Sequence, residues 1–169
     1  KEFLNTNKLS ADATNSAMVK RVGQRISAAV TSYLTKNKYA NRVAGYNWEF
    51  NLVDDKTVNA WCMPGGKVAF YTAILPICQD ETGIAVVMGH EVAHAIANHG
   101  RERMSQGIVQ QLGGVALSVA LANKSVETQN IFNSAYVVGT NVGLLLPFSR
   151  KQELEADHYG LIFAAMAGY

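Results

Sequence analysis

The residues His90-Glu91-Val92-Ala93-His94 have the types and spacing required for metal-dependent hydrolysis. Two residues four apart on an α-helix differ by about 40° of rotation, so both imidazoles leave the same face one turn apart. The spacing therefore lets His90 and His94 bind one zinc ion, with Glu91 beside them and able to reach a water molecule. The alternative is two helix histidines at the edge of a core with a solvated glutamate.

A catalytic zinc site needs a third protein ligand and one open position, and the segment 150–157 offers carboxylates for the third ligand. Glu153 and Asp157 are four residues apart and share a helix face, whereas Glu155 points about 200° away from Glu153. One carboxylate of the pair can bind zinc while the other accepts a hydrogen bond from a ligating imidazole. The alternative is an exposed acidic helix.

The pattern of apolar residues predicts strands in the first half of the chain and helices after them. Strands come before a run of helices without β-α-β alternation, which favours an α+β domain with a small antiparallel sheet. We predict one domain over residues 1–169, with no internal boundary. The predicted strands are 46–52, 58–63 and 67–71, and the predicted helices are 12–36, 72–78, 80–98, 101–123, 125–146 and a last one that Ser149 and Gln152 cap from position 149 onward.

The composition excludes several classes of protein. Of 169 residues, 49% are apolar and 17% are charged, with a net charge of +2, which excludes a disordered chain and gives no basic surface for nucleic acid. The charge deficit is local, because Lys124 and Glu127 are the only charged residues between Met104 and Ser149. Close helix packing through glycines explains this stretch, or else it contacts a membrane, a second subunit or a C-terminal segment.

The two cysteines and the N-terminus give weaker indications. Cys62 and Cys78 are too few for a thiolate zinc site and are either two free thiols or one disulfide. The chain begins at Lys1 without a recognisable signal peptide, so we expect that a targeting segment has been removed.

Three motifs in this order resemble the zinc metallopeptidases that include the heat-shock protease HtpX and the CAAX prenyl endopeptidases. In chain order they are the segment Asn59-Ala60-Trp61-x-Met63-Pro64-Gly65-Gly66-Lys67, then His90-Glu91-x-x-His94, then Glu153-x-Glu-Ala-Asp157. The resemblance covers nearly the whole length from about Tyr46. It is strongest to the soluble, extracytoplasmic bacterial branch, and family members of this type usually continue beyond the last helix.

The resemblance implies a zincin-like catalytic domain of the gluzincin type. One zinc ion per chain would be bound by His90, His94 and Glu153, with Glu91 as catalytic base and Asp157 as the hydrogen-bond partner of a ligand. The resemblance also places Asn59 and Ala60 on an edge strand that pairs with an extended substrate. The alternative for Asn59 is that it satisfies a buried backbone group.

The function predicted from this resemblance is zinc-dependent hydrolysis of peptide bonds in polypeptide substrates, in protein quality control. The predicted location is the bacterial periplasm or cell envelope. One rival is a zinc-stabilised chaperone-like or binding module whose site is blocked or unused. The other is a membrane-anchored protease, although polar residues such as Gln110, Gln111 and Asn141 within the low-charge helices favour a soluble hairpin.

Overall fold

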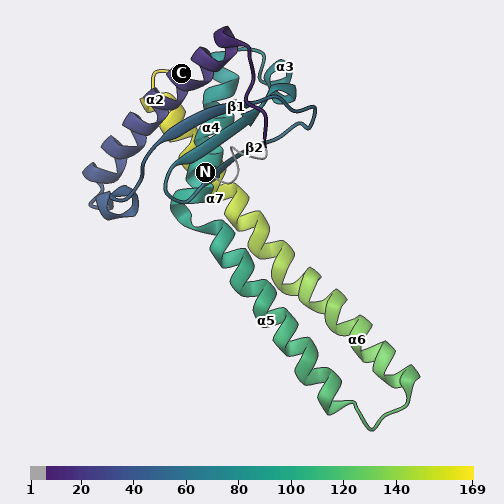
Figure 1. Cartoon of the computed structure of the whole chain (residues 1–169). Helices are drawn as coiled ribbons and strands as arrows, with labels where there is room; N and C mark the ends of the chain where they lie inside the picture. The colour runs from purple at the N-terminus through teal and green to yellow at the C-terminus, as the bar shows by residue number, and fades with distance from the viewer. Residues whose placement is uncertain (1–6) are drawn as a thin grey trace. The chain divides into compact units, whose positions relative to one another are not determined.

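The computed structural model describes residues 7–169, which form a mostly helical α+β structure with one three-stranded sheet (Figure 1). The chain divides into two compact units, one running up to Asn98 and including Glu155–Tyr169, the other spanning His99–Leu154. The first unit contains α2 (Ala13–Lys36), η1 (Ala40–Val43), β1 (Glu49–Val53), β2 (Ala60–Met63), β3 (Lys67–Tyr71), η2 (Thr72–Ile74), α3 (Leu75–Cys78), α4 (Glu81–Ala97) and the C-terminal part of α7 (Leu146–Met166).

The core of the first unit is built from one apolar stripe of each element. On α2, Val19, Val22, Ile26 and Val30 are fully buried at the spacing of a single helix face, as the apolar pattern predicts. Helix α2 packs against β1 and α4, and β2 packs against α4. The fully buried Phe163 of α7 belongs to the same core, so α4 is fixed on several sides.

The sheet is mixed, which corrects the prediction of an antiparallel sheet. The strand order is β1-β3-β2, with β2 antiparallel to β3 but β1 parallel to it. Gly65 and Gly66 have positive φ angles and close the β2–β3 hairpin. The loop between β1 and β2 contacts the end of β3: the Thr72 hydroxyl donates to the Asp55 carbonyl at 2.9 Å and accepts from the Asp55 N–H at 3.2 Å.

One predicted helix boundary differs from the structure. Helix α4 is capped by Asp80 as expected and ends at Ala97, close to the predicted end, with Asn98 as its cap in a left-handed conformation (φ 61°) that asparagine tolerates well. The last helix begins before Ser149, because the α6, η3 and α7 segments follow one another without a break. Ser149 is therefore inside α7, and Gln152 is free to make contacts elsewhere.

The second unit is an antiparallel pair of helices, α5 (His99–Ala120) and α6 (Val126–Thr140), followed by the π-helical η3 (Asn141–Leu145) and the start of α7. The two helices lie side by side in Figure 1. The Tyr136 hydroxyl of α6 donates to the Gln110 carbonyl of α5 at 3.0 Å. By length and composition, the continuous helical segment Val126–Met166 could cross a membrane.

Candidate metal centre

Helix α4 positions the His90-Glu91-x-x-His94 motif. Asp80 fixes the start of the helix by accepting a hydrogen bond from the Gly83 N–H at 2.9 Å. Met88 and Val92, on the helix face opposite the histidines, are completely buried. The half-buried imidazoles of His90 and His94 consequently point to the same side, with their Nε2 atoms 3.0 Å apart. Two imidazole nitrogens on one tetrahedral zinc ion would be roughly 3.3 Å apart, so this pair is already close to a ligating arrangement.

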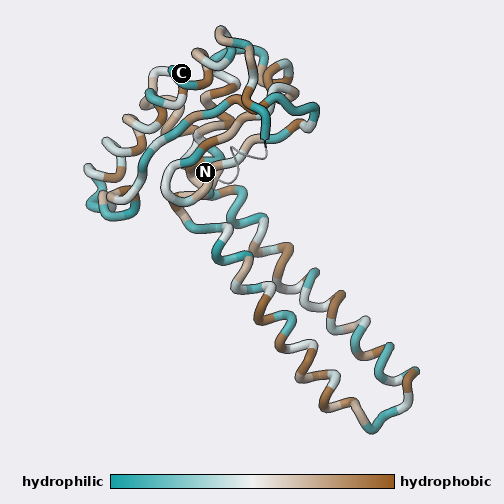
Figure 2. The backbone as a smooth tube through the Cα atoms, viewed as in Figure 1, coloured by the Kyte–Doolittle hydropathy of each residue, from teal (hydrophilic) through white to brown (hydrophobic). Residues whose placement is uncertain are grey.

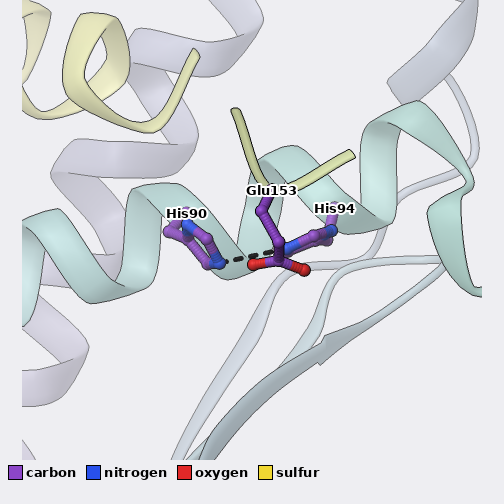
Figure 3. Close-up of side chains that lie close together, drawn as sticks. All are labelled: His90, His94 and Glu153. Atoms are coloured by element: carbon purple, nitrogen blue, oxygen red, sulfur yellow. Dashed lines mark hydrogen bonds between the residues drawn. The ribbon is translucent and has the colours of Figure 1, made fainter. Parts of the chain in front are cut away.

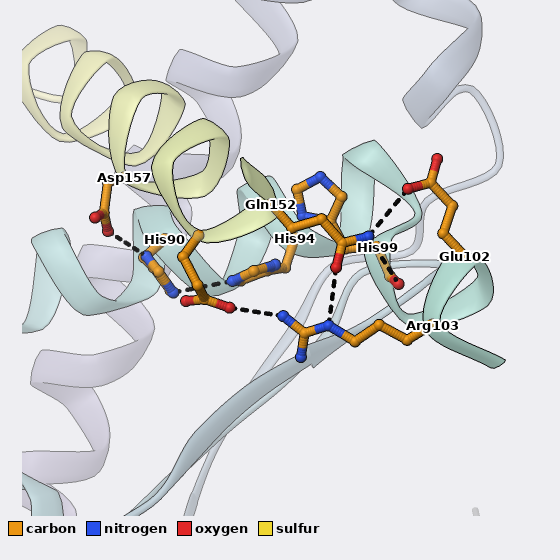
Figure 4. Close-up of polar contacts among 8 residues, drawn as sticks. His90, His94, His99, Glu102, Arg103, Gln152 and Asp157 are labelled. Carbon is orange, nitrogen blue, oxygen red and sulfur yellow. Dashed lines mark hydrogen bonds and ion pairs between the residues drawn. The ribbon is translucent and has the colours of Figure 1, made fainter. Parts of the chain in front are cut away.

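Asp157 on α7 contacts the other nitrogen of the His90 ring (Figure 4). Its Oδ1 lies 2.8 Å from Nδ1 of His90. An ionised carboxylate can only accept, so Nδ1 carries the proton and donates it to this hydrogen bond. In a neutral ring, Nε2 then presents its lone pair toward His94, as metal binding requires.

Glu153 precedes Asp157 by one turn of α7 and completes the candidate donor set. One ligand atom from each of His90, His94 and Glu153 lies within 4.8 Å of the other two, and Figure 3 shows the three side chains converging. Two imidazole nitrogens and one carboxylate oxygen match the donor chemistry of a catalytic zinc site with an open fourth position. The residues present therefore fit a zinc ion.

Side chains of the second unit form a polar cluster around the Glu153 carboxylate, which no pattern in the sequence predicts. Arg103 of α5 donates to Glu153 Oε1 at 2.6 Å and to the Gln152 side chain at 2.9 Å (Figure 4). The buried Gln152 amide in turn donates to the Glu102 carboxylate at 3.0 Å. The only sequence signal was Gln152 itself, which the predicted capping box had assigned to a helix start.

Two glycines bring α4 and α7 into backbone contact beside the histidines. A Cβ atom added to Gly89 would lie 2.5 Å from the Gly160 carbonyl oxygen, and one added to Gly160 would lie 2.7 Å from the backbone nitrogen of His90. Because Asp157 lies one turn before Gly160, this close approach is what lets its short side chain reach His90. An isolated glycine inside a helical pattern is the signal that could have indicated the crossing.

We therefore expect Gly160→Ala to destabilise the first unit and to weaken metal binding. The added methyl group overlaps backbone atoms, which cannot move as a flexible side chain would, and overpacking of this kind costs about 1–3 kcal/mol. The matched control is Gly107→Ala on α5, where nothing lies within 4 Å of the added Cβ and alanine favours the helix. Thermal unfolding with and without zinc measures both variants, and equal melting temperatures would contradict the proposed role of the crossing.

The edge strand β2 carries the other predicted site residues. Among residues 7–169, β3 is the only strand that pairs with β2, so the other edge of β2 has no strand partner in this part of the chain. Ala60 is buried at the start of β2, and the exposed Asn59 precedes it and accepts a backbone hydrogen bond from Tyr71 at 3.1 Å. The alternation of an antiparallel ladder then directs the N–H and C=O groups of Ala60 and Cys62 toward the open edge.

Glu91 is electrostatically coupled to this strand. Burial, and after it the negative charge of Glu91, raises the pKa of Cys62 to about 12. The thiol is thus protonated at neutral pH and is not a thiolate ligand or nucleophile. Both Cys62 and Cys78 are free, which excludes the disulfide alternative.

The chain is similar in sequence to known metalloendopeptidases. The chain is 40% identical over 120 residues to the mitochondrial metalloendopeptidase OMA1 of Schizosaccharomyces pombe, covering 71% of this chain and 33% of that protein. It is 37% identical over 125 residues to OMA1 of Saccharomyces cerevisiae, covering 73% of this chain and 34% of that protein. The beta-barrel assembly-enhancing protease of Escherichia coli is 26% identical over 125 residues, covering 72% of this chain and 26% of that protein. The chain thus spans about a third or less of the length of each.

These relatives correct the predicted location. The prediction of the bacterial periplasm or envelope is wrong, because the relatives at 37–40% identity are mitochondrial enzymes whereas the bacterial protease is matched at 26%. The membership of the HtpX and CAAX branch stays a prediction, but the wider family does not. The model of peptidase family M48 matches residues 11–169, and the chain belongs to that family.

Proposed function

We propose that this chain is the zincin-like catalytic domain of a zinc metalloendopeptidase that cleaves polypeptides. The observation that carries the proposal is the convergence of His90, His94 and Glu153, with Asp157 fixing the proton on His90. In this proposal the three residues hold one zinc ion in a gluzincin arrangement, and Asp157 orients a ligand.

The chemistry divides between the metal and the side chains. When bound, zinc would supply Lewis-acid chemistry by lowering the pKa of the attacking water and polarising the scissile carbonyl. Glu91 accepts the proton of that water as it attacks the carbonyl carbon, and then delivers the proton to the leaving amine. Asp157 keeps the His90 ring in the tautomer whose Nε2 lone pair is available throughout.

The edge of β2 provides a place for the substrate. An extended peptide can add to this edge as a further strand, with its backbone paired to the N–H and C=O groups of Ala60 and Cys62. The negative charge of Glu91 on α4 contributes to the raised pKa of Cys62 on β2. This coupling supports a scissile bond that lies near the base when the substrate pairs with β2. Only an unfolded or locally extended segment can bind in this way, a requirement that suits an enzyme of protein quality control.

Cys62→Pro tests this substrate site. Proline removes the N–H that faces the open edge but no hydrogen bond of the β2–β3 ladder, and proline is tolerated at such edge positions. We expect KM for a peptide of eight or more residues to rise about tenfold, the equivalent of one lost hydrogen bond of about 1.4 kcal/mol, while zinc content is unchanged. Cys62→Ala, which removes the thiol and keeps the N–H, is the control with parental KM. Equal KM values for the two variants would exclude pairing at Cys62.

Chelation separates the proposed peptidase from a zinc-stabilised binding module. The purified chain is expected to cleave denatured casein, to lose this activity completely in phenanthroline, and to regain it when zinc is added in excess. The binding module would instead lose only thermal stability in phenanthroline, with no casein cleavage before or after. Metal analysis of the active sample identifies the ion.

A further inference from the structure

The helices of the second unit expose apolar side chains to an unusual extent. Figure 2 shows hydrophobic positions recurring along both helices. The following residues have half or more of their surface exposed: Met104, Ile108, Leu112, Val115 and Val119 before the turn, and Ile131, Phe132, Val137, Val138 and Val142 after it. Exposed patches of this size mark a surface that contacts something apolar.

Several polar side chains of this unit connect the two helices, among them Gln110, Tyr136 and Thr140. The Gln110 amide of α5 donates to the Thr140 hydroxyl at 2.7 Å and to the Asn141 side chain at 3.3 Å. Tyr136 closes the same contact through the Gln110 carbonyl. A helix pair in water buries apolar groups and exposes polar ones. Here many apolar side chains are exposed, while Gln110, Tyr136 and Thr140 contact one another between the helices. This distribution is typical of a helix pair surrounded by hydrocarbon, where polar groups must satisfy one another.

The apolar surface is wider than the contact stripe of one protein partner. Consecutive residues on a helix point about 100° apart. The neighbours Ile131 and Phe132 are both exposed, and so are Val137 and Val138. Two directions of α6 are therefore apolar in addition to the face that meets α5, which favours a surrounding medium over a second copy docked on one side.

The lengths and charges match a lipid bilayer. The uncharged runs are 20 residues (104–123) and 22 residues (128–149), separated by a turn that carries Lys124 and Glu127. At 1.5 Å per residue, each run is about 30 Å long when helical, the thickness of the hydrocarbon core. Arg101, Arg150 and Lys151 flank the runs on the other side, at the depth of the lipid headgroups.

We propose that the hairpin 104–149 inserts into a lipid bilayer and spans it, with the turn at Lys124 on the far side. The inference rests on the second unit alone and does not depend on peptidase activity. Two exposed amides lie near the middle of the arms, Gln111 and Asn141, and Asn141 accepts a hydrogen bond from Gln110 of the other arm. The exposed Asn123 and Asn130 lie near the turn, at headgroup depth in this arrangement.

Vesicle flotation tests the proposal on the full chain carrying Glu91→Gln, which prevents self-cleavage. With phosphatidylcholine vesicles in 0.5 M salt, which screens adsorption by charge, we expect the protein to float with the lipid. Leu112→Lys with Val138→Lys places two charges at the centres of the arms and should lower the partition at least a hundredfold. The control pair, Val58→Lys with Ile77→Lys, changes equally exposed residues of the first unit and should float like the parent.

Trypsin added outside the vesicles tests the depth. Cleavage after Arg103 and Arg150 with survival of the intact 104–150 peptide places Lys124 behind the membrane, whereas detergent should restore cleavage after Lys124. Three results would overturn the proposal: protein that stays in solution with the vesicles, a lysine pair that floats like the parent, or cleavage at Lys124 without detergent. A lipid-free dimer whose formation the Leu112→Lys and Val138→Lys pair abolishes would assign the surface to a second copy.

Discussion

The Glu91→Gln variant is expected to bind zinc as tightly as the parent and to cleave a peptide about 10²–10⁴ times more slowly, the range that a positioned general base contributes. Glutamine keeps the size of the side chain and its distance from the ligands, but it cannot accept the proton of the attacking water. The loss should appear in kcat, because Glu91 acts on the reacting atoms and not on the bound chain of the substrate. Single-turnover peptide cleavage measures it.

A matched control is Glu127→Gln, the same substitution in the first turn of α6. It should cleave at the parental rate, so any loss specific to Glu91 is not a consequence of reduced negative charge. Casein digestion by zinc-loaded Glu91→Gln at the parental rate would show that another group accepts the proton.

Glu153→Ala and His94→Ala should each lower zinc affinity more than a hundredfold. Each change removes a direct donor atom, whereas loss of an outer hydrogen-bond partner of a ligand costs about 10–100-fold. Asp157→Ala, which removes only the contact to Nδ1 of His90, should therefore fall in that smaller range. The difference between the two classes of variant distinguishes a ligand from a residue that orients one.

Competition with a chromophoric chelator measures these affinities without reference to activity. If Asp157→Ala lost zinc as completely as Glu153→Ala, Asp157 would be a direct ligand. Retention of parental zinc affinity by Glu153→Ala would instead remove Glu153 from the donor set. Circular dichroism of each zinc-free variant separates loss of the metal from loss of the fold.

Local periodicity was sufficient for most elements. The stripe of Val22, Ile26 and Val30 predicts helix α2, and the Asp80 cap predicts the start of α4, because helix geometry and capping are set by residues within a few positions. The sheet was different. A sequence pattern specifies which residues alternate but not which strands pair. The parallel pairing of β1 with β3, beside which Thr72 contacts Asp55, depends on contacts between distant segments.

The candidate site divides in the same way. The spacings of His90 with His94 and of Glu153 with Asp157 each place two side chains on one helix face, which the sequence by itself determined. The assignment of a role to each carboxylate came from a family resemblance. In the structure, Asp157 contacts Nδ1 of His90, while Glu153 has a carboxylate oxygen within 4.8 Å of a ligand atom of each histidine. No spacing within α7 specifies this arrangement.

Contacts between distant segments were decided by the tertiary structure alone. Gly89 and Gly160 are 71 residues apart, and their importance exists only where the two helix backbones touch. Arg103 is 50 residues from Glu153 in the chain, and no sequence pattern indicated that the two side chains would contact each other. The sequence determined the chemistry that each helix presents, because periodicity is local. Which helices approach one another, and how closely, depended on long-range packing that local spacing does not encode.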